Sequence, residues 1–212
     1  MYDWRKMTAE EKIETLTKRK ESGRPWHGPP FRDSGESTYL ITSACFEHRS
    51  VIGYSRERIG DFARNLLTSL SDACPSRNVH SWVVLPNHYH VLCDISNVAA
   101  AKRTLGGLHG RTSFEWNRQE DCPGRKVWFR ALETKIKNER HYWSTVNYIH
   151  RNPLKHQCVS DLKEWPWSSF AEWMEGMGRE SLAALWKAYP TERFGERWDE
   201  GDLSIEGKSL LE

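Results

Sequence analysis

Two periods of apolar residues alternate along the middle of the chain and predict an order of strands and helices. β-branched and aromatic residues cluster between turn formers in several short segments. Between these segments, apolar residues recur every three or four positions, which is the spacing of one helix face. In chain order the pattern predicts strand 38–46, helix 55–73, strand 79–84, strand 88–92, helix 98–119 and a fourth strand or extended segment over 127–136. This βαββαβ order is typical of the ferredoxin-like α+β fold, an antiparallel sheet with helices on one face.

Capping and turn residues refine the two helices of this unit. Ser55 is the natural N-cap of the first helix, with Arg58 in place of the usual Glu three residues later. Gly106 and Gly107 fall within the second helix, where a glycine costs about 1 kcal/mol relative to alanine. We therefore expect the second helix to be interrupted or loosened at this pair.

A further helix is predicted from Asn138 to Asn152, because helices often end before a proline and Pro153 follows. After it, we expect a bend that pins two tryptophans against the domain, then one helix over 180–188 and a loosely ordered acidic tail.

The chain is expected to fall into three parts. Residues 1–37 form an N-terminal helix, over 8–21, and a Gly- and Pro-rich arm that either touches a ligand or wraps the surface. Residues 38–170 form the α+β domain with its additional helix, and residues 171–212 form a C-terminal extension.

The second and third strands predict a hairpin whose far strand begins with two histidines. Pro86 and Asn87 between the strands are turn formers. His88 and His90 are two residues apart on a strand, so both project from one face about 7 Å apart. Two neutral imidazoles side by side can hold one divalent ion together with a further ligand from elsewhere. Without such a ligand, two histidines spaced in this way are an ordinary half-exposed surface feature. We expect both to face away from the packed helices, because a site beneath helices would be closed to a polymer.

The helix before Pro153 carries the candidate partners. Tyr148 and Asn152 are four residues apart, so their side chains share one face. Tyr148 is a candidate nucleophile, and the Asn152 side-chain oxygen is a candidate metal ligand. The alternative is a core tyrosine whose hydroxyl bonds to backbone. His150, two residues along the helix, points elsewhere and is a weak candidate for a general base.

Charge is distributed unevenly, although the net charge is only +2. Residues 102–156 contain twelve Lys and Arg against five Asp and Glu, whereas residues 157–212 contain six against twelve. The basic segment suits a polyanionic partner, with a solvated helix face as the alternative.

Five scattered cysteines indicate reduced thiols, and no apolar run approaches the ~20 residues of a membrane span, so a cytoplasmic protein is expected.

Three motifs, taken in order, resemble a known family. The segment from Leu85 to Leu92 is similar to the histidine–hydrophobic–histidine (HUH) segment of single-tyrosine transposases that act on single-stranded DNA. The run Tyr148 to Pro153 resembles their tyrosine-bearing helix end, and residues 165–169 resemble the segment that follows. The subgroup most similar is the REP-associated tyrosine transposases, which are linked to short palindromic repeats. The resemblance extends over about 39–170 and covers neither the arm nor the acidic tail.

The resemblance implies a ferredoxin-like palm and a Mg²⁺ or Mn²⁺ ion held by His88, His90 and Asn152. Many relatives carry Gln in place of Asn152, and either amide oxygen suits a hard cation. It also implies that Tyr148 attacks a phosphodiester, forming a 5′-phosphotyrosine and releasing a 3′-hydroxyl. The implied substrate is single-stranded DNA that carries REP-like hairpins, and the expected assembly is a monomer or homodimer without a membrane. Phosphate contacts are expected from the basic segment, at Arg103, Arg111, Arg118, Lys126, Arg130, Lys135, Lys137 and Arg140.

Two other functions remain open from the sequence. One is a hairpin-binding regulatory protein that keeps the fold without robust cleavage. The other, an RNA-binding or replication-initiator protein, is disfavoured because initiators usually bring additional domains. A further hypothesis is that the acidic tail competes with DNA for the basic surface.

Overall fold

The computed structural model describes residues 37–73, 79–191 and 194, together with Thr8, Glu10 and Glu14. The chain divides into two units, Met1–Ser34 and Gly35–Glu212. Apart from Thr8, Glu10 and Glu14, the predicted helix over 8–21 lies outside the described residues, as do the arm and the acidic tail beyond Phe194. None of the described helices is long and apolar enough to span a bilayer.

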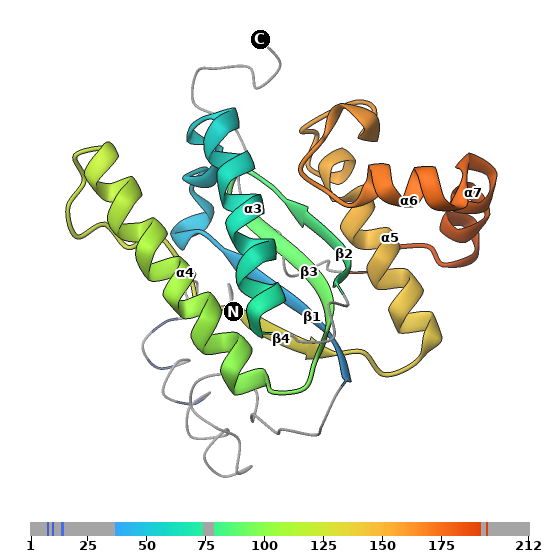
Figure 1. The fold of residues 1–212 in the computed structure, drawn as a ribbon, viewed down its shortest axis with the longest axis horizontal. Coiled ribbons are helices and arrows are strands. Elements are labelled where there is room, and N and C mark those ends of the chain that lie inside the picture. Colours follow the sequence, from blue (N-terminus) through green and yellow to red (C-terminus); the bar gives the residue numbers. More distant parts are fainter. Residues whose placement is uncertain are drawn as a thin grey trace. The chain divides into compact units, whose positions relative to one another are not determined.

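A four-stranded antiparallel sheet forms the centre of the second unit (Figure 1). The pairing order is β2-β3-β1-β4, and every neighbouring pair is antiparallel. The strands are β1 (Ser37–Ala44), β2 (Val79–Val84), β3 (His88–Ile95) and β4 (Leu132–Lys135). An α+β fold with an antiparallel sheet is therefore confirmed. Within the predicted strand or extended segment over 127–136, the strand is β4, and before it Trp128 forms an isolated bridge to Cys45 while Val127 and Trp128 are buried.

Helices α3 (Arg56–Ala73) and α4 (Val98–Gln119) cover one face of the sheet (Figure 1). Ser55 caps α3 as expected, since its hydroxyl oxygen accepts a hydrogen bond from the Arg58 amide at 3.2 Å. The predicted break at Gly106 and Gly107 is wrong, because α4 is continuous. Leu105 and Leu108 on either side are buried, and their packing outweighs the local preference of the glycines.

Helix α5 (Glu139–Lys155) packs on the opposite face, against β2 and β3. Neighbouring residues of β3 show the two faces. The ring of Tyr89 contacts Phe62 of α3, whereas the ring of His90 contacts Tyr148 of α5. Side chains alternate along a strand, so α5 and α3 lie on different sides of the sheet.

The predicted end of α5 before Pro153 is wrong. The helix runs through Pro153 to Lys155, and the amide of His156 still bonds to the carbonyl of Asn152 at 3.0 Å. Proline in a helix forfeits one hydrogen bond, but Asn152 and Pro153 are both buried, and tertiary packing holds the last turn in place.

The segment after α5 returns to the edge of β2. It contains a 3₁₀ turn, η3 (Leu162–Glu164), after which the Trp167 carbonyl accepts a hydrogen bond from the amide of Val84 at 2.9 Å. The indole of Trp165 donates to the carbonyl of Val84 at 3.0 Å. The bend that pins the tryptophans is thereby confirmed. Two helices follow. The first, α6 (Phe170–Met177), was not predicted, whereas the second, α7 (Arg179–Ala188), was.

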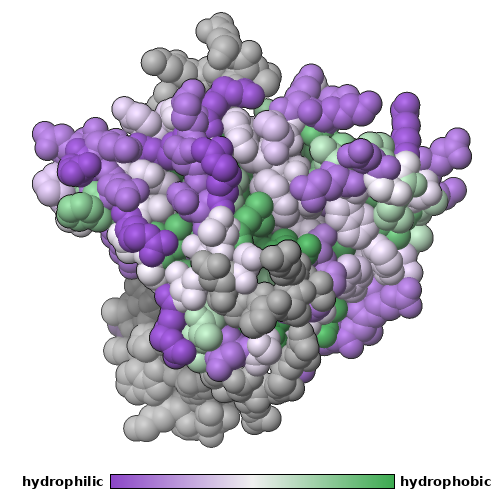
Figure 2. Space-filling view, viewed as in Figure 1, coloured by the Kyte–Doolittle hydropathy of each residue, from purple (hydrophilic) through white to green (hydrophobic). Residues whose placement is uncertain are grey.

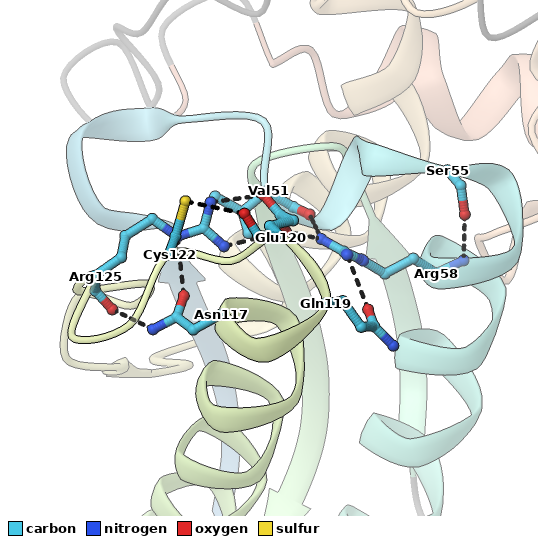
Figure 3. Close-up of polar contacts among 8 residues, drawn as sticks. All are labelled: Val51, Ser55, Arg58, Asn117, Gln119, Glu120, Cys122 and Arg125. Atoms are coloured by element: carbon cyan, nitrogen blue, oxygen red, sulfur yellow. Dashed lines mark hydrogen bonds and ion pairs between the residues drawn. The ribbon is translucent and has the colours of Figure 1, made fainter.

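A charged network fixes the loop that precedes α3 (Figure 3). This loop contains the 3₁₀ turns η1 (Phe46–His48) and η2 (Ile52–Tyr54). The guanidinium of Arg58 donates to the Val51 carbonyl at 3.0 Å and to Glu120 at 2.5 Å. Arg125 bonds to the other oxygen of Glu120 at 2.7 Å. Burial alone would raise the pKa of Glu120, but the bonds from Arg125 and Arg58 outweigh it and lower the pKa.

Replacing Arg58 with alanine should therefore destabilise the fold by about 3 kcal/mol, because Arg58 is buried and its loss leaves Glu120 and the Val51 carbonyl short of a donor. Urea denaturation monitored by fluorescence would measure the change. The matched control is Arg64→Ala in the same helix, whose ion pair with Asp61 is mostly exposed and whose loss should cost less than about 0.5 kcal/mol. Equal effects of the two variants would contradict a structural role for the network.

Candidate active site

The corner between β2 and β3 is held rigidly against the loop that carries η1 and η2. The amide of Gly53 donates to the Pro86 carbonyl at 2.8 Å, and the amide of Cys45 donates to the Asn87 carbonyl at 2.7 Å. A Cβ atom on Gly53 would lie 2.5 Å from the Cβ of Pro86, so only glycine allows this approach. The corner thus sets the position at which β3 begins with His88.

The two histidines project from one face of β3, as predicted. Their ring centroids are 5.0 Å apart, and the exposed fractions are 2% for His88 and 0% for His90. Each ring is oriented through Nδ1. Asn87 Oδ1 lies 2.5 Å from Nδ1 of His88, and the Thr42 hydroxyl lies 2.8 Å from Nδ1 of His90. Hydrogen bonds of this kind fix the ring orientation and leave Nε2 toward the site.

Tyr148 meets the histidine pair through its hydroxyl. The phenol oxygen is 3.3 Å from Nε2 of His90, and the two ring centroids are 5.0 Å apart. The ring is 2% exposed. The ring belongs to the buried core, as the alternative of a core tyrosine expected, and its hydroxyl faces an imidazole of β3.

Asn152 presents an oxygen to His88. Its Oδ1 is 3.1 Å from Nε2 of His88, while its Nδ2 faces the carbonyl of Tyr148 at 3.4 Å. Asn87 donates through Nδ2 to the His48 carbonyl at 3.0 Å, so its Oδ1 accepts the proton on Nδ1 of His88. In neutral His88, Nε2 then carries a lone pair that faces the lone pairs of Asn152 Oδ1.

Two facing acceptors repel each other unless a cation or a proton joins them. Donor atoms at right angles on an ion about 2.1 Å away lie about 3.0 Å apart, close to the 3.1 Å separation of these two atoms. The residues therefore fit a divalent ion. The described residues contain no group of three or more His, Cys, Asp or Glu side chains suited to a metal, so such an ion would depend on the Asn152 amide in addition to the imidazoles.

The site is enclosed, contrary to the expectation of a face open to a polymer. The histidines do face away from α3 and α4, but α5 lies over them. The ring of Phe194 packs at a tilt against that of Tyr148, with a centroid distance of 5.0 Å. The ammonium of Lys155 lies 5.1 Å from the centre of the Tyr148 ring. The sequence predicted the strand face correctly but not the element that covers it.

Two residues at the site were missed because α5 was expected to end before them. Lys155 approaches the Tyr148 ring, and His156 packs edge to face on His88 with centroids 5.1 Å apart. Asn152 was identified because it lies four residues after Tyr148 on a helix. The same spacing, applied once more, reaches His156. Thr42 was also missed, since its role follows from its pairing with His90 across β1 and β3.

His150 lies away from the site, as expected. It is fully buried, and its Nε2 is 3.1 Å from the Ser81 hydroxyl and 2.9 Å from the Ser169 hydroxyl. Burial lowers the pKa of His150 to about 3. A neutral histidine tied to two serines joins β2, α5 and the segment before α6.

All eight predicted phosphate contacts have exposed side chains. By contrast, Lys102 and Arg125 of the same segment are held in ion pairs with Glu133 and Glu120. Hydrophilic residues dominate the outer surface of α4 (Figure 2), although Phe114 is also 69% exposed there. Which of the eight residues contact a ligand stays a prediction.

The fold is that of a solved transposase. The chain aligns with the structure of a REP-associated tyrosine transposase bound to a REP hairpin with a TM-score of 0.54, at 22% identity, over 72% of this chain and 86% of that one. At this identity the likeness establishes the fold alone.

Comparison with curated proteins confirms the resemblance to REP-associated tyrosine transposases. The chain is 31% identical over 98 residues to the REP-associated tyrosine transposase of Escherichia coli K12, which is 43% of this chain and 53% of that protein. A relative from Haemophilus influenzae strain Rd, assigned to the same family, gives 31% over 98 residues, 41% of this chain and 55% of that protein. The chain thus spans about half the length of the curated relatives it matches. The sequence matches no family profile.

Proposed function

We propose that this protein is a metal-dependent single-strand DNA endonuclease and strand transferase that acts on REP-like hairpin DNA. The observation that carries the proposal is the contact of the Tyr148 hydroxyl with His90 Nε2 at 3.3 Å, beside the contact of His88 with Asn152 at 3.1 Å. A candidate nucleophile and an amide oxygen from α5 thus contact two imidazoles from β3. A tyrosine nucleophile beside residues that fit a divalent ion is suited to covalent transfer of a phosphodiester.

His88, His90 and Asn152 would hold the divalent ion, Mg²⁺ or Mn²⁺. Such an ion, when bound, withdraws charge from a non-bridging phosphate oxygen and orients the phosphate for in-line displacement. Asn87 and Thr42 hold the imidazoles with Nε2 toward the site. The burial of the whole set keeps bulk water from competing with the tyrosine.

The chemical step is a transesterification. The Tyr148 oxygen forms a bond to phosphorus, and the bond from phosphorus to the 3′-oxygen breaks. The phenol loses its proton, and the departing strand gains one to become a 3′-hydroxyl. The 5′-phosphotyrosine that remains conserves the energy of the phosphodiester, so a second strand's 3′-hydroxyl can reverse the step without ATP.

Two further features support the assignment to hairpin DNA. The solved relative with this fold is bound to a REP hairpin. The eight exposed Lys and Arg residues of the basic segment supply phosphate contacts.

The element order and the strand order β2-β3-β1-β4 support a ferredoxin-like palm as the frame of the site.

A second candidate function is a hairpin-binding regulatory protein that does not cleave. The observation that favours it is the enclosure of the site, with Tyr148 only 2% exposed beneath the Phe194 ring. The same fold and basic residues would then serve binding alone.

One experiment separates the two candidates. A labelled hairpin oligonucleotide with single-stranded flanks is incubated with the protein and Mn²⁺, and adducts are resolved on a denaturing gel. The proposed enzyme becomes linked to the 5′ end of the downstream fragment, and EDTA prevents this adduct. Salt-dependent binding that is indifferent to EDTA, without any adduct over hours, would establish the binding protein instead.

A further inference from the structure

The ring of Tyr54, at the end of η2, is 64% exposed and yet held in place from one side. The central carbon of the Arg58 guanidinium lies 4.2 Å from the centre of this ring. That guanidinium is buried and is itself fixed by hydrogen bonds to Val51, Gln119 and Glu120 (Figure 3). One face of the tyrosine ring is therefore covered by a buried cation, and the exposed area belongs to the other face.

A second aromatic ring meets an arginine from the same turn of α3. The guanidinium carbon of Arg56, which is exposed, lies 5.0 Å from the centre of the half-buried Trp167 ring. A guanidinium over tyrosine or tryptophan is a favourable cation–π arrangement. The first turn of α3 thus places one arginine on each of two aromatic rings.

Both rings are tied through the backbone to the corner between β2 and β3. The amide of Gly53 donates to the Pro86 carbonyl at 2.8 Å, and the tyrosine is the next residue in the chain. On the other side, the Trp167 carbonyl accepts a hydrogen bond from the amide of Val84 at 2.9 Å. Since His88 follows this corner at the start of β3, both rings are anchored at the end of the sheet where the candidate active site lies.

We propose that Tyr54 is a stacking platform for an unpaired DNA base that adjoins the cleaved phosphodiester. A fixed aromatic ring with one open face accepts any base, because every base has a π-face. Arg56 adds positive charge for the phosphates of the same strand, and Trp167 offers it a second ring. The inference rests on the proposed function for its ligand, hairpin DNA with single-stranded flanks, but it does not depend on the cleavage step.

The test measures binding in EDTA, so that no cleavage intervenes, by fluorescence anisotropy. The two ligands are a labelled hairpin oligonucleotide with single-stranded flanks and the same hairpin without its flanks. Tyr54→Ala should weaken binding of the flanked hairpin about tenfold, the loss typical of one base–aromatic stack. Tyr54→Phe keeps the ring and should stay within about twofold of the wild type. Both variants should bind the trimmed hairpin as the wild type does, which also shows that they fold.

An abasic scan along the flanks locates the stacked base. One abasic position should lower the wild-type affinity about tenfold and leave the affinity of Tyr54→Ala unaltered, because the two changes remove the same contact. That position should adjoin the phosphodiester at which the adduct forms. Phe114→Ala is the matched control, since the Phe114 ring of α4 is similarly exposed, at 69%, and its removal should change the affinity for the flanked hairpin less than about twofold.

The outcomes distinguish this inference from the proposed function. Equal affinities of the wild type and Tyr54→Ala for the flanked hairpin would overturn the platform, while an adduct formed by the wild type with Mn²⁺ would leave the proposed function standing. Equal losses in Phe114→Ala and Tyr54→Ala, or additive losses in the abasic scan, would also overturn the platform. A flank-dependent loss in Tyr54→Ala without any wild-type adduct would support the platform and overturn the cleavage.

Discussion

Replacing Tyr148 with phenylalanine should abolish the covalent protein–DNA adduct, with a fall of at least about a thousandfold in the rate of its formation. The substitution removes the oxygen that would bond to phosphorus in the proposed mechanism and leaves the ring between His90 and Phe194. Hairpin affinity should stay within about twofold, because the basic residues are unaltered. The measurement is a denaturing gel for the adduct together with a filter-binding or anisotropy assay for affinity.

Tyr142→Phe provides the matched control for this variant. Tyr142 is another tyrosine of α5, and its hydroxyl lies 3.0 Å from Nδ1 of His80, away from the histidine pair. This variant should form the adduct at nearly the wild-type rate. An adduct that persists in Tyr148→Phe would assign the nucleophile to another residue and end the mechanism in its present form.

Replacing His88 with alanine should weaken Mn²⁺ binding about a hundredfold or more and reduce cleavage in proportion. His88 joins the pair to Asn152, so its removal takes away one ligand and the partner that faces the amide oxygen. Thr42→Val should give a smaller loss, about tenfold, because the Thr42 hydroxyl orients His90 through Nδ1 without touching the ion. Calorimetry with Mn²⁺ measures both effects without DNA.

His80→Ala is the control for the histidine series. His80 lies on β2 beside Asp94 and Tyr142, and it has no contact with the candidate ligands in the described part of the chain. Its removal should leave Mn²⁺ affinity unchanged. Equal losses in His80→Ala and His88→Ala would indicate that the metal binds without using the β3 pair.

The strands and the histidine pair were predictable because a strand offers few choices. Side chains alternate with a period of two, so once β3 begins at His88, His90 must share its face. Pro86 and Asn87 marked the corner for equally local reasons. Tyr148 and Asn152 followed from the spacing of a helix, and the structure brings both to the predicted histidines.

Other features depended on packing that the sequence alone does not display. Pro153 is a local signal for the end of a helix, yet buried neighbours carry α5 onward to Lys155. The glycine pair is a local signal for a break, yet Leu105 and Leu108 hold α4 straight through it. In both cases long-range burial outweighed a local cost of a few kcal/mol or less. The cover over the site is likewise a tertiary arrangement and left no periodic signal.

The depth of the histidine pair and of Tyr148 has a kinetic consequence. In the proposed mechanism an uncovering motion must come before the bond-making step, because side chains that are at most 2% exposed leave no opening as wide as a DNA strand. At saturating DNA the rate should then level off at the frequency of that motion. Removing the Phe194 ring from Tyr148, with Phe194→Ala, should raise this plateau even though phenylalanine takes no part in the proposed transesterification.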